Sequence, residues 1–192
     1  MKNKKKIVFV HGHGGVEGES WPYWLDREAT RCGFDFIALS MPNPMYPQVS
    51  EWVGFLKEQE IKVDKDTYFV GHSLGCITIA RFLESLSPRT VAAGCILISG
   101  FSSLPNIPLL SDFCLLPLDF SKVKKHAKEF VCILSDNDHV IPPEETEEFS
   151  RKLGARTIVE HDKGHFRYDV KELPSVLNTI LEMELVREKL KR

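Results

Sequence analysis

The sequence predicts a three-layer α/β/α sandwich built on a mostly parallel sheet of about six strands. Short apolar runs that suit buried parallel strands alternate with stretches of helical periodicity, and no internal repeat or linker interrupts them. The 192 residues are 43% hydrophobic and 27% charged, which suits one core that buries roughly 70% of the unfolded surface. We therefore expect a single domain over residues 1–192.

Each strand is expected to lead into a helix. The first strand, from Ile7 to Val10, ends in a glycine-rich turn, and the helix after it has Ser20 as a candidate N-cap and Gly33 as its stop. Between 99 and 120 the periodicity fails, so we expect a long irregular connection there. Further strands are expected at 34–39, 67–70, 91–98, 130–134 and 157–159, and further helices at 49–56, 74–83, 142–154 and 173–181.

Charge and cysteine usage exclude several classes of protein. A formal net charge of −2 and a pI near 6.4 do not indicate a basic surface that would bind a polyanion, so we expect no nucleic-acid partner. The basic start is followed by only four apolar residues, too few for a secretion signal, and no apolar run is long enough to span a bilayer. Five cysteines, an odd number without CxxC spacing, fit a reducing cytoplasm.

The first candidate for chemistry is Ser73. It stands in Gly71-His72-Ser73-Leu74-Gly75, where a β-branched and aromatic run gives way to a helical pattern. Strand, tight turn and helix in that order would hold the hydroxyl at the carboxyl end of the sheet, with glycines removing Cβ atoms that would collide there. Alone, the pentapeptide also fits an ordinary turn.

A serine nucleophile needs a histidine base and an acid that orients it. The loop after the strand at 130–134 offers Asp136 and Asp138, and the loop after the strand at 157–159 offers His161 and His165. We assign Asp138 and His165, because each lies deeper in its loop than its rival, and Gly164 lets the chain turn His165 inward. The order serine, aspartate, histidine, each after a strand, favours acyl-transfer chemistry.

The oxyanion that forms during acyl transfer needs two fixed donors. The backbone N–H of Leu74 is one candidate, and that of His13, in the turn after the first strand, is the other, with Gly14 as the alternative to His13. The histidine pairs at 11 and 13 and at 161 and 165 lack a further ligand at a familiar zinc spacing, so we expect no metal. The glycine turn lacks the Gly-Lys-Ser/Thr of a phosphate loop, and we expect no cofactor.

These motifs together resemble a known group. The segments His11-Gly12-His13-Gly14-Gly15, Gly71-His72-Ser73-Leu74-Gly75, Ser135-Asp136-Asn137-Asp138 and Gly164-His165-Phe166 are similar to those of the small serine hydrolases related to retinoblastoma-binding protein 9. The resemblance implies a compact α/β-hydrolase fold without a lid domain, with Ser73, Asp138 and His165 as the triad. Members of the group often have Pro-Gly where this chain has His11-Gly12.

The expected function is hydrolysis of small carboxylic esters, or of amides, through an acyl-enzyme on Ser73. Two alternatives stay open: a peptidase or thioesterase of the same mechanism, and a protein-interaction module with little catalytic activity. The expected partner is a small acyl substrate; nothing in the sequence indicates a protein partner. The apolar segment 101–117 either lines an acyl pocket beside Ser73 or packs as a connector.

Overall fold

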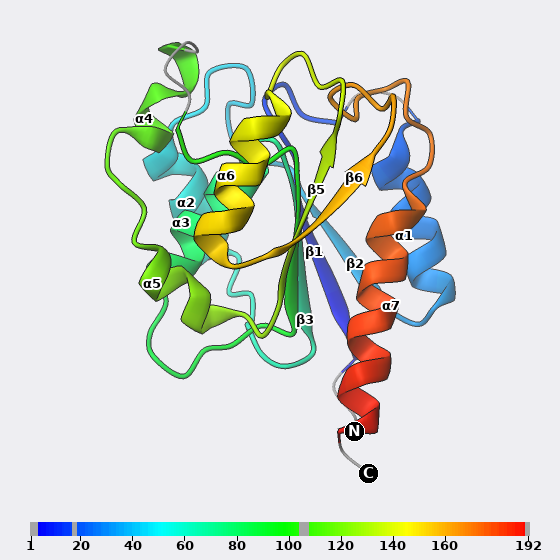
Figure 1. The fold of residues 1–192 in the computed structure, drawn as a ribbon. Coiled ribbons are helices and arrows are strands. Elements are labelled where there is room, and N and C mark those ends of the chain that lie inside the picture. The colour runs from blue at the N-terminus through cyan, green and yellow to red at the C-terminus, as the bar shows by residue number, and fades with distance from the viewer. Residues whose placement is uncertain (1–3, 17–18, 104–107, 191–192) are drawn as a thin grey trace.

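A six-stranded sheet with all strands parallel forms the centre of the molecule (Figure 1). The computed structural model describes residues 4–16, 19–103 and 108–190. The strand order across the sheet is β2-β1-β3-β4-β5-β6. The strands are β1 (Lys6–Val10), β2 (Asp35–Leu39), β3 (Thr67–His72), β4 (Gly94–Ile98), β5 (Phe130–Ser135) and β6 (Arg156–Glu160).

Helices cover both faces of this sheet, which gives the expected three layers. The helices α1 (Trp21–Arg31) and α7 (Pro174–Lys189) pack together on one face, while α2 (Val49–Glu58), α3 (Leu74–Glu84) and α6 (Pro143–Leu153) lie on the other (Figure 1). The predicted fold class is therefore confirmed. None of the helices in the described ranges has the length and hydropathy needed to cross a membrane.

The alternation of side chains along each strand divides the core between these two faces. Residues such as Phe9 and Tyr68 pack against Trp21 of α1 and Ile180 of α7. The other cluster joins the second face of the strands to α2, α3 and α6. Because α3 lies over the middle of the sheet, nine of its eleven residues are buried, which explains why it is apolar nearly all round.

Several element boundaries differ from the sequence prediction, and the largest difference is that α7 continues to Lys189, beyond the expected end at 181. At two strands the structure gives the reason. Strand β3 continues through Gly71 to His72, because the tight turn begins only at Ser73. Strand β4 begins at Gly94 rather than at 91, because Ala92 makes an isolated parallel bridge to Ala127 ahead of the regular ladder. The apolar run at 91–98 therefore includes the approach to the strand as well as the strand.

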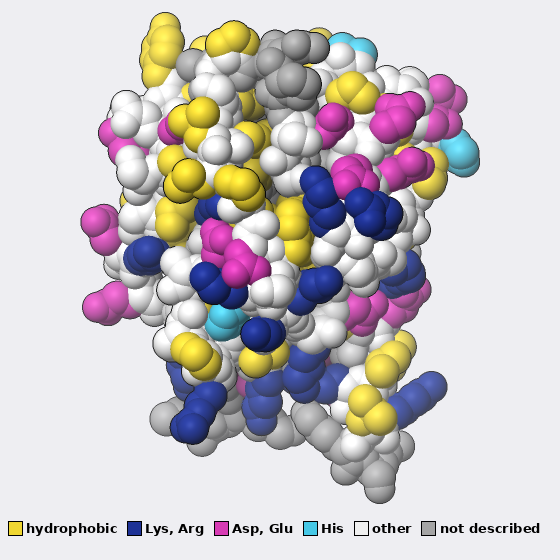
Figure 2. Space-filling model, turned by 60° about the vertical axis from the view of Figure 1, so that its left-hand side comes forward, with side chains coloured by type: hydrophobic (Ala, Val, Ile, Leu, Met, Phe, Trp, Pro, Cys, Tyr) yellow, Lys and Arg dark blue, Asp and Glu magenta, His cyan; other side chains and the backbone are white. Residues whose placement is uncertain are grey.

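The expected irregular connection between β4 and β5 contains short helical turns: η1 (Pro108–Leu110), α4 (Ser111–Cys114), α5 (Phe120–Val123) and η2 (Lys124–His126). Residues 104–107 of this segment lie outside the described residues. Phe101 and Phe113 are fully buried in the core, whereas Leu115 and Leu116 are mostly exposed. Figure 2 shows apolar side chains gathered on the upper part of one face of the molecule, with basic side chains on its middle and lower parts.

The order of the strands creates a crevice where the winding reverses. From β1 the chain passes to β2 on one side and then returns to β3 on the other. The loops that follow β1 and β3 therefore leave the carboxyl edge of the sheet in different directions, and sites of parallel sheets form at such points. The glycine turn after β1 and the serine turn after β3 meet there.

Candidate active site

Ser73 lies in a strained turn between β3 and α3. Its backbone has φ 52° and ψ −118°, a conformation that costs a residue with a side chain roughly 1–3 kcal/mol. The turn is held by two backbone hydrogen bonds, from the N–H of Ser73 to the carbonyl of Ile98 at 2.8 Å and from the N–H of Cys76 to the carbonyl of Ser73 at 2.9 Å. The predicted strand, turn and helix are present.

The two glycines of the pentapeptide are required by packing. A Cβ on Gly75 would stand 2.1 Å from the carbonyl oxygen of Val10, and one on Gly71 would stand 3.0 Å from the backbone nitrogen of Cys76. The absence of side chains at both positions lets α3 start directly against β1 and β3. Gly12 in the turn after β1 also approaches closely, since its Cβ would lie 3.1 Å from that of Ser73.

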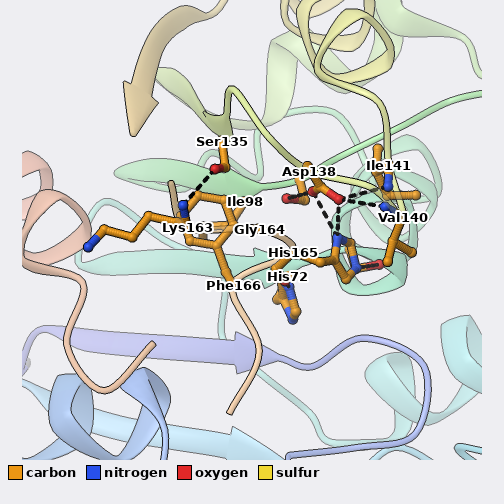
Figure 3. Close-up of polar contacts among 12 residues, drawn as sticks. His72, Ile98, Ser135, Asp138, Val140, Ile141, Lys163, Gly164, His165 and Phe166 are labelled. Carbon is orange, nitrogen blue, oxygen red and sulfur yellow. Dashed lines mark hydrogen bonds and ion pairs between the residues drawn. The ribbon is translucent and has the colours of Figure 1, made fainter. Parts of the chain in front are cut away.

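The side chains of Ser73, His165 and Asp138 form one continuous chain of hydrogen bonds. His165 Nε2 lies 3.0 Å from Ser73 Oγ, and His165 Nδ1 lies 2.8 Å from Asp138 Oδ2 and 3.1 Å from Oδ1. Because the carboxylate only accepts, Nδ1 carries a proton, which leaves the Nε2 lone pair facing the serine hydroxyl. Figure 3 shows Asp138 and His165 facing each other, and all three residues are buried.

Asp138 is fixed by donors on several sides. Its Oδ1 accepts the backbone N–H groups of Val140 and Ile141, each at 2.9 Å (Figure 3), and its Oδ2 accepts the hydroxyl of Ser99 at 2.7 Å. Burial by itself would raise the pKa of this carboxyl. The hydrogen bond and charge of His165, with the bonds from Ser99 and Ile141, outweigh burial and hold the pKa below its usual value.

Asp136 and His161, the alternatives to Asp138 and His165 in the sequence analysis, form a separate pair on the surface. His161 Nδ1 lies 2.6 Å from Asp136 Oδ2, and the His161 side chain is 77% exposed. Asp136 Oδ1 also accepts the N–H of Asp162 at 3.0 Å, so it holds the turn as expected for a loop carboxylate. Neither residue belongs to the hydrogen-bond chain that reaches Ser73.

Polar residues that the sequence analysis did not select bind the two loops together. Asn137 Oδ1 accepts the N–H of Gly164 at 2.7 Å, and Ser135 Oγ accepts the N–H of Lys163 at 3.0 Å (Figure 3). Ser99, which supports Asp138, was missed as well. Its signal was its place directly after β4, in line with the other loops at this edge of the sheet.

His72, the residue before Ser73, was also missed as part of the site. Its ring lies 5.0 Å from that of His165, and its Nε2 lies 2.9 Å from the backbone carbonyl of His165. A carbonyl only accepts, so Nε2 of His72 carries the proton. Burial, reinforced by the charge that His165 would carry when protonated, lowers the pKa of His72 to about 3, so this ring stays neutral.

The turn after β1 is organised by its own contacts. His11 Nε2 accepts the N–H of Met41 at 3.1 Å, and His11 Nδ1 donates to the carbonyl of Gly12 at 2.7 Å; burial lowers the pKa of this histidine. The N–H of Gly14 donates to the carbonyl of Pro44 at 2.9 Å. Within the described residues, the backbone N–H groups of His13 and Leu74 have no partner, so both remain open to a ligand.

A cavity of about 170 Å³ opens beside Ser73 and His165. Its walls come from the turn after β1, the start of α1, the elbow at 72–73, and the segments at 140–141 and 165–168. Of the described residues at 101–117, Leu110 lines this cavity, and the buried aromatic residues of that segment pack in the core instead. A second cavity of about 330 Å³ adjoins it and shares Phe9, His11, Gly15, Val16 and Pro22.

An α/β/α sandwich with a buried serine, histidine and aspartate joined in sequence at the carboxyl edge of its parallel sheet is a protein of the α/β-hydrolase class. Comparison with known proteins places it more narrowly. Residues 7–179 match the family model described as "Serine hydrolase". The chain therefore belongs to the serine hydrolase family.

Individual relatives agree with this placement. YdeN of Bacillus subtilis (strain 168) is 32% identical over 166 residues, which are 86% of this chain and 87% of YdeN. The crystal structure of the ydeN gene product superposes with a TM-score of 0.89, covering 93% of this chain and 98% of that one. Serine hydrolase RBBP9 of Rattus norvegicus is 28% identical and covers 94% of this chain and 98% of its own.

Proposed function

We propose that this chain hydrolyses small carboxylic esters through an acyl-enzyme formed on Ser73. The observation that carries the proposal is the 3.0 Å approach of His165 Nε2 to Ser73 Oγ, with Asp138 behind His165 at 2.8 Å. That geometry is the one in which a neutral imidazole removes the proton of an attacking hydroxyl. Membership of the serine hydrolase family supports the same reading.

In the first half of the reaction, Ser73 Oγ forms a bond with the ester carbonyl carbon while its proton passes to His165 Nε2. The carbonyl oxygen becomes an oxyanion, and we expect the N–H groups of Leu74 and His13, which have no partner in the described part of the chain, to donate to it. Asp138 stabilises the resulting imidazolium and stays ionised. The tetrahedral intermediate then collapses, and the alcohol leaves with the proton of His165.

In the second half, His165 removes a proton from water, and the hydroxide attacks the acyl-serine. Collapse of the second intermediate releases the carboxylic acid and restores Ser73 with the proton from His165. The cavity beside Ser73 and the one that adjoins it provide space for the acyl and alcohol groups of a small ester. We favour esters because an activated serine hydroxyl reacts with them readily. Thioesters and amides are the alternative substrates.

The test combines a fluorophosphonate probe with a substrate panel. Wild type should be labelled, and Ser73→Ala should not be labelled and should lose roughly 10⁴-fold or more in ester turnover. The panel compares an ester, a thioester and an amide of one acyl group. A folded wild type that is not labelled would favour an interaction module, and faster turnover of the thioester or amide than of the ester would replace the esterase assignment.

A further inference from the structure

Arg167 carries the one formal charge at pH 7 among the described residues that line the cavity beside Ser73. Its guanidinium makes no hydrogen bond or ion pair within the described ranges. Asp169, the acidic residue nearest to Arg167 in sequence, and Glu19, which precedes Ser20, do not line the cavity. An uncompensated guanidinium at the wall of a concave site attracts an anion and pairs well with a carboxylate.

Ser20 supplies a second, independent observation on the same cavity. It occupies the N-cap position of α1, but its side chain makes no cap hydrogen bond, contrary to the expected capping role. The side chain of Asp119, by contrast, caps α5 by accepting the N–H groups of Ser121 and Lys122. Ser20 is only 6% exposed, lines the cavity, and has no side-chain partner in the described part of the chain. Its Oγ is not one of the fully buried side-chain atoms that lack a partner, so the hydroxyl reaches the open space of the cavity and is free to bind a ligand.

The N-terminus of α1 adds a positive electrostatic potential, which has the same sign as the charge of Arg167. This helix has eleven residues and no acidic side chain in its first turn, so the partial positive charge at its N-terminus is not neutralised from within the helix. The N–H of Trp21 already donates to the carbonyl of Val170, and Pro22 has no N–H. The helix therefore contributes potential, while Ser20 and Arg167 provide the donors.

We propose that the natural ester substrate carries a carboxylate group, which is bound by the Arg167 guanidinium with the Ser20 hydroxyl as a second donor. This inference rests on the proposed function of Ser73 and names its substrate class. The apolar walls at Val16, Trp21 and Phe166 suit the hydrocarbon between the ester and the carboxylate. One guanidinium and one hydroxyl match the single charge of a carboxylate better than the double charge of a phosphate monoester.

The test uses two pairs of matched esters, because the carboxylate could stand on either side of the ester bond. Monomethyl glutarate and methyl hexanoate differ at the acyl end, and the acetate ester of 4-hydroxybutanoate and pentyl acetate differ at the alcohol end. Acid release in a pH-stat gives kcat/KM for each. Wild type should prefer the anionic ester at least tenfold in one pair, and that pair identifies the side that reaches Arg167.

The variants ask whether Arg167 produces that preference. Arg167→Gln should lower the ratio of anionic to neutral kcat/KM at least tenfold, mainly through KM, and Arg167→Lys should restore part of it. Ser20→Ala should lower the ratio severalfold. Arg31→Gln is the matched control, since Arg31 lies in the last turn of α1, is 67% exposed and pairs with Glu28; it should leave the ratio unchanged. Added salt should reduce the preference.

The two proposals can fail separately. Ser73-dependent hydrolysis with no preference for an anionic ester in either pair, or with an unchanged ratio in Arg167→Gln, would overturn the carboxylate site and leave the esterase intact. Calorimetric titration of Ser73→Ala with both anionic esters reads binding without turnover. Binding there that is lost when Arg167→Gln is added would support the site even if no ester is hydrolysed, and absence of binding to both would overturn it.

Discussion

The imidazole of His72 donates a hydrogen bond of 2.9 Å to the backbone carbonyl of His165. The residue before the proposed nucleophile thus holds the main chain of the proposed base, across the crevice between the elbow after β3 and the loop after β6. The ring of Trp21 packs edge-on against His72, and its Nε1 donates to the carbonyl of Phe166 at 2.9 Å. Two successive carbonyls of the histidine loop are therefore fixed from the same side.

We predict that His72→Ala lowers kcat for ester hydrolysis roughly tenfold to a hundredfold with little change in KM, because a base displaced by even a fraction of an ångström removes the serine proton less well. His72→Gln, whose amide can donate to the same carbonyl, should recover part of the rate. The second-order rate of fluorophosphonate labelling should fall in parallel. A His72→Ala protein with a lower melting temperature but a normal labelling rate would restrict His72 to a structural role.

His72 should also make the stability of the fold depend on pH. In the folded protein its pKa is lowered to about 3, with burial as the main cause, whereas in the unfolded chain it is near 6.5. Between these values the unfolded state binds the proton and the folded state does not. The free energy of unfolding therefore decreases as pH falls below about 6.5. The upper limit of this decrease at pH 3 is about 5 kcal/mol, and the actual decrease is smaller because the ring borders the cavity.

Urea unfolding of wild type and His72→Gln at several values between pH 7 and pH 4 measures this effect. The slope of the unfolding free energy against pH should be smaller in the variant, by up to ~1.4 kcal/mol per pH unit. Comparing slopes rather than absolute values allows for the hydrogen bond that the substitution alters at every pH. Asp138, with its lowered pKa, also loses stabilising effect in acid, but in both proteins alike. Equal slopes would contradict the prediction.

The sequence was sufficient to predict the layers and the position of the serine turn, because both depend on local patterns. Apolar runs and helical periodicity predict the alternation of strands and helices, and the glycines at 71 and 75 are required by contacts with neighbouring backbone. The choice of Asp138 over Asp136 followed from position in a loop, and the structure joins Asp138, rather than Asp136, to His165. The catalytic use of these residues stays a prediction.

The supporting residues could not be predicted in the same way, because their partners are distant in the chain. Ser99 and Asp138 are 39 residues apart, and His72 and His165 are 93 apart. A serine after a strand or a histidine before a serine has no pattern that names such a partner. The expected cap at Ser20 failed for a related reason: the residue lies at the correct position, but the tertiary fold places it at the wall of the cavity.

The two aspartate–histidine pairs allow a matched comparison. Asp138→Asn should lower kcat about 10⁴-fold, because an amide no longer favours the histidine tautomer that leaves Nε2 free. Asp136→Asn and His161→Ala remove the same kinds of group from an exposed pair of the same two loops and should change kcat less than twofold. Measurement of kcat on one ester for all three variants decides the matter. A large loss from His161→Ala with a small loss from Asp138→Asn would reverse the assignment.

The elbow itself is tested most directly at its second glycine. Gly75→Ala should destabilise the protein by more than about 3 kcal/mol, because the new Cβ would stand 2.1 Å from the carbonyl oxygen of Val10 and 2.8 Å from that of His11, both of them backbone atoms that have little room to yield. Gly54→Ala is the control: Gly54 lies inside α2, and a Cβ there meets nothing within 4 Å. That substitution should stabilise the fold by about 0.5–1 kcal/mol. Urea unfolding of both variants measures the difference, and a Gly75→Ala protein as stable as wild type would mean that α3 can move away from β1 without cost.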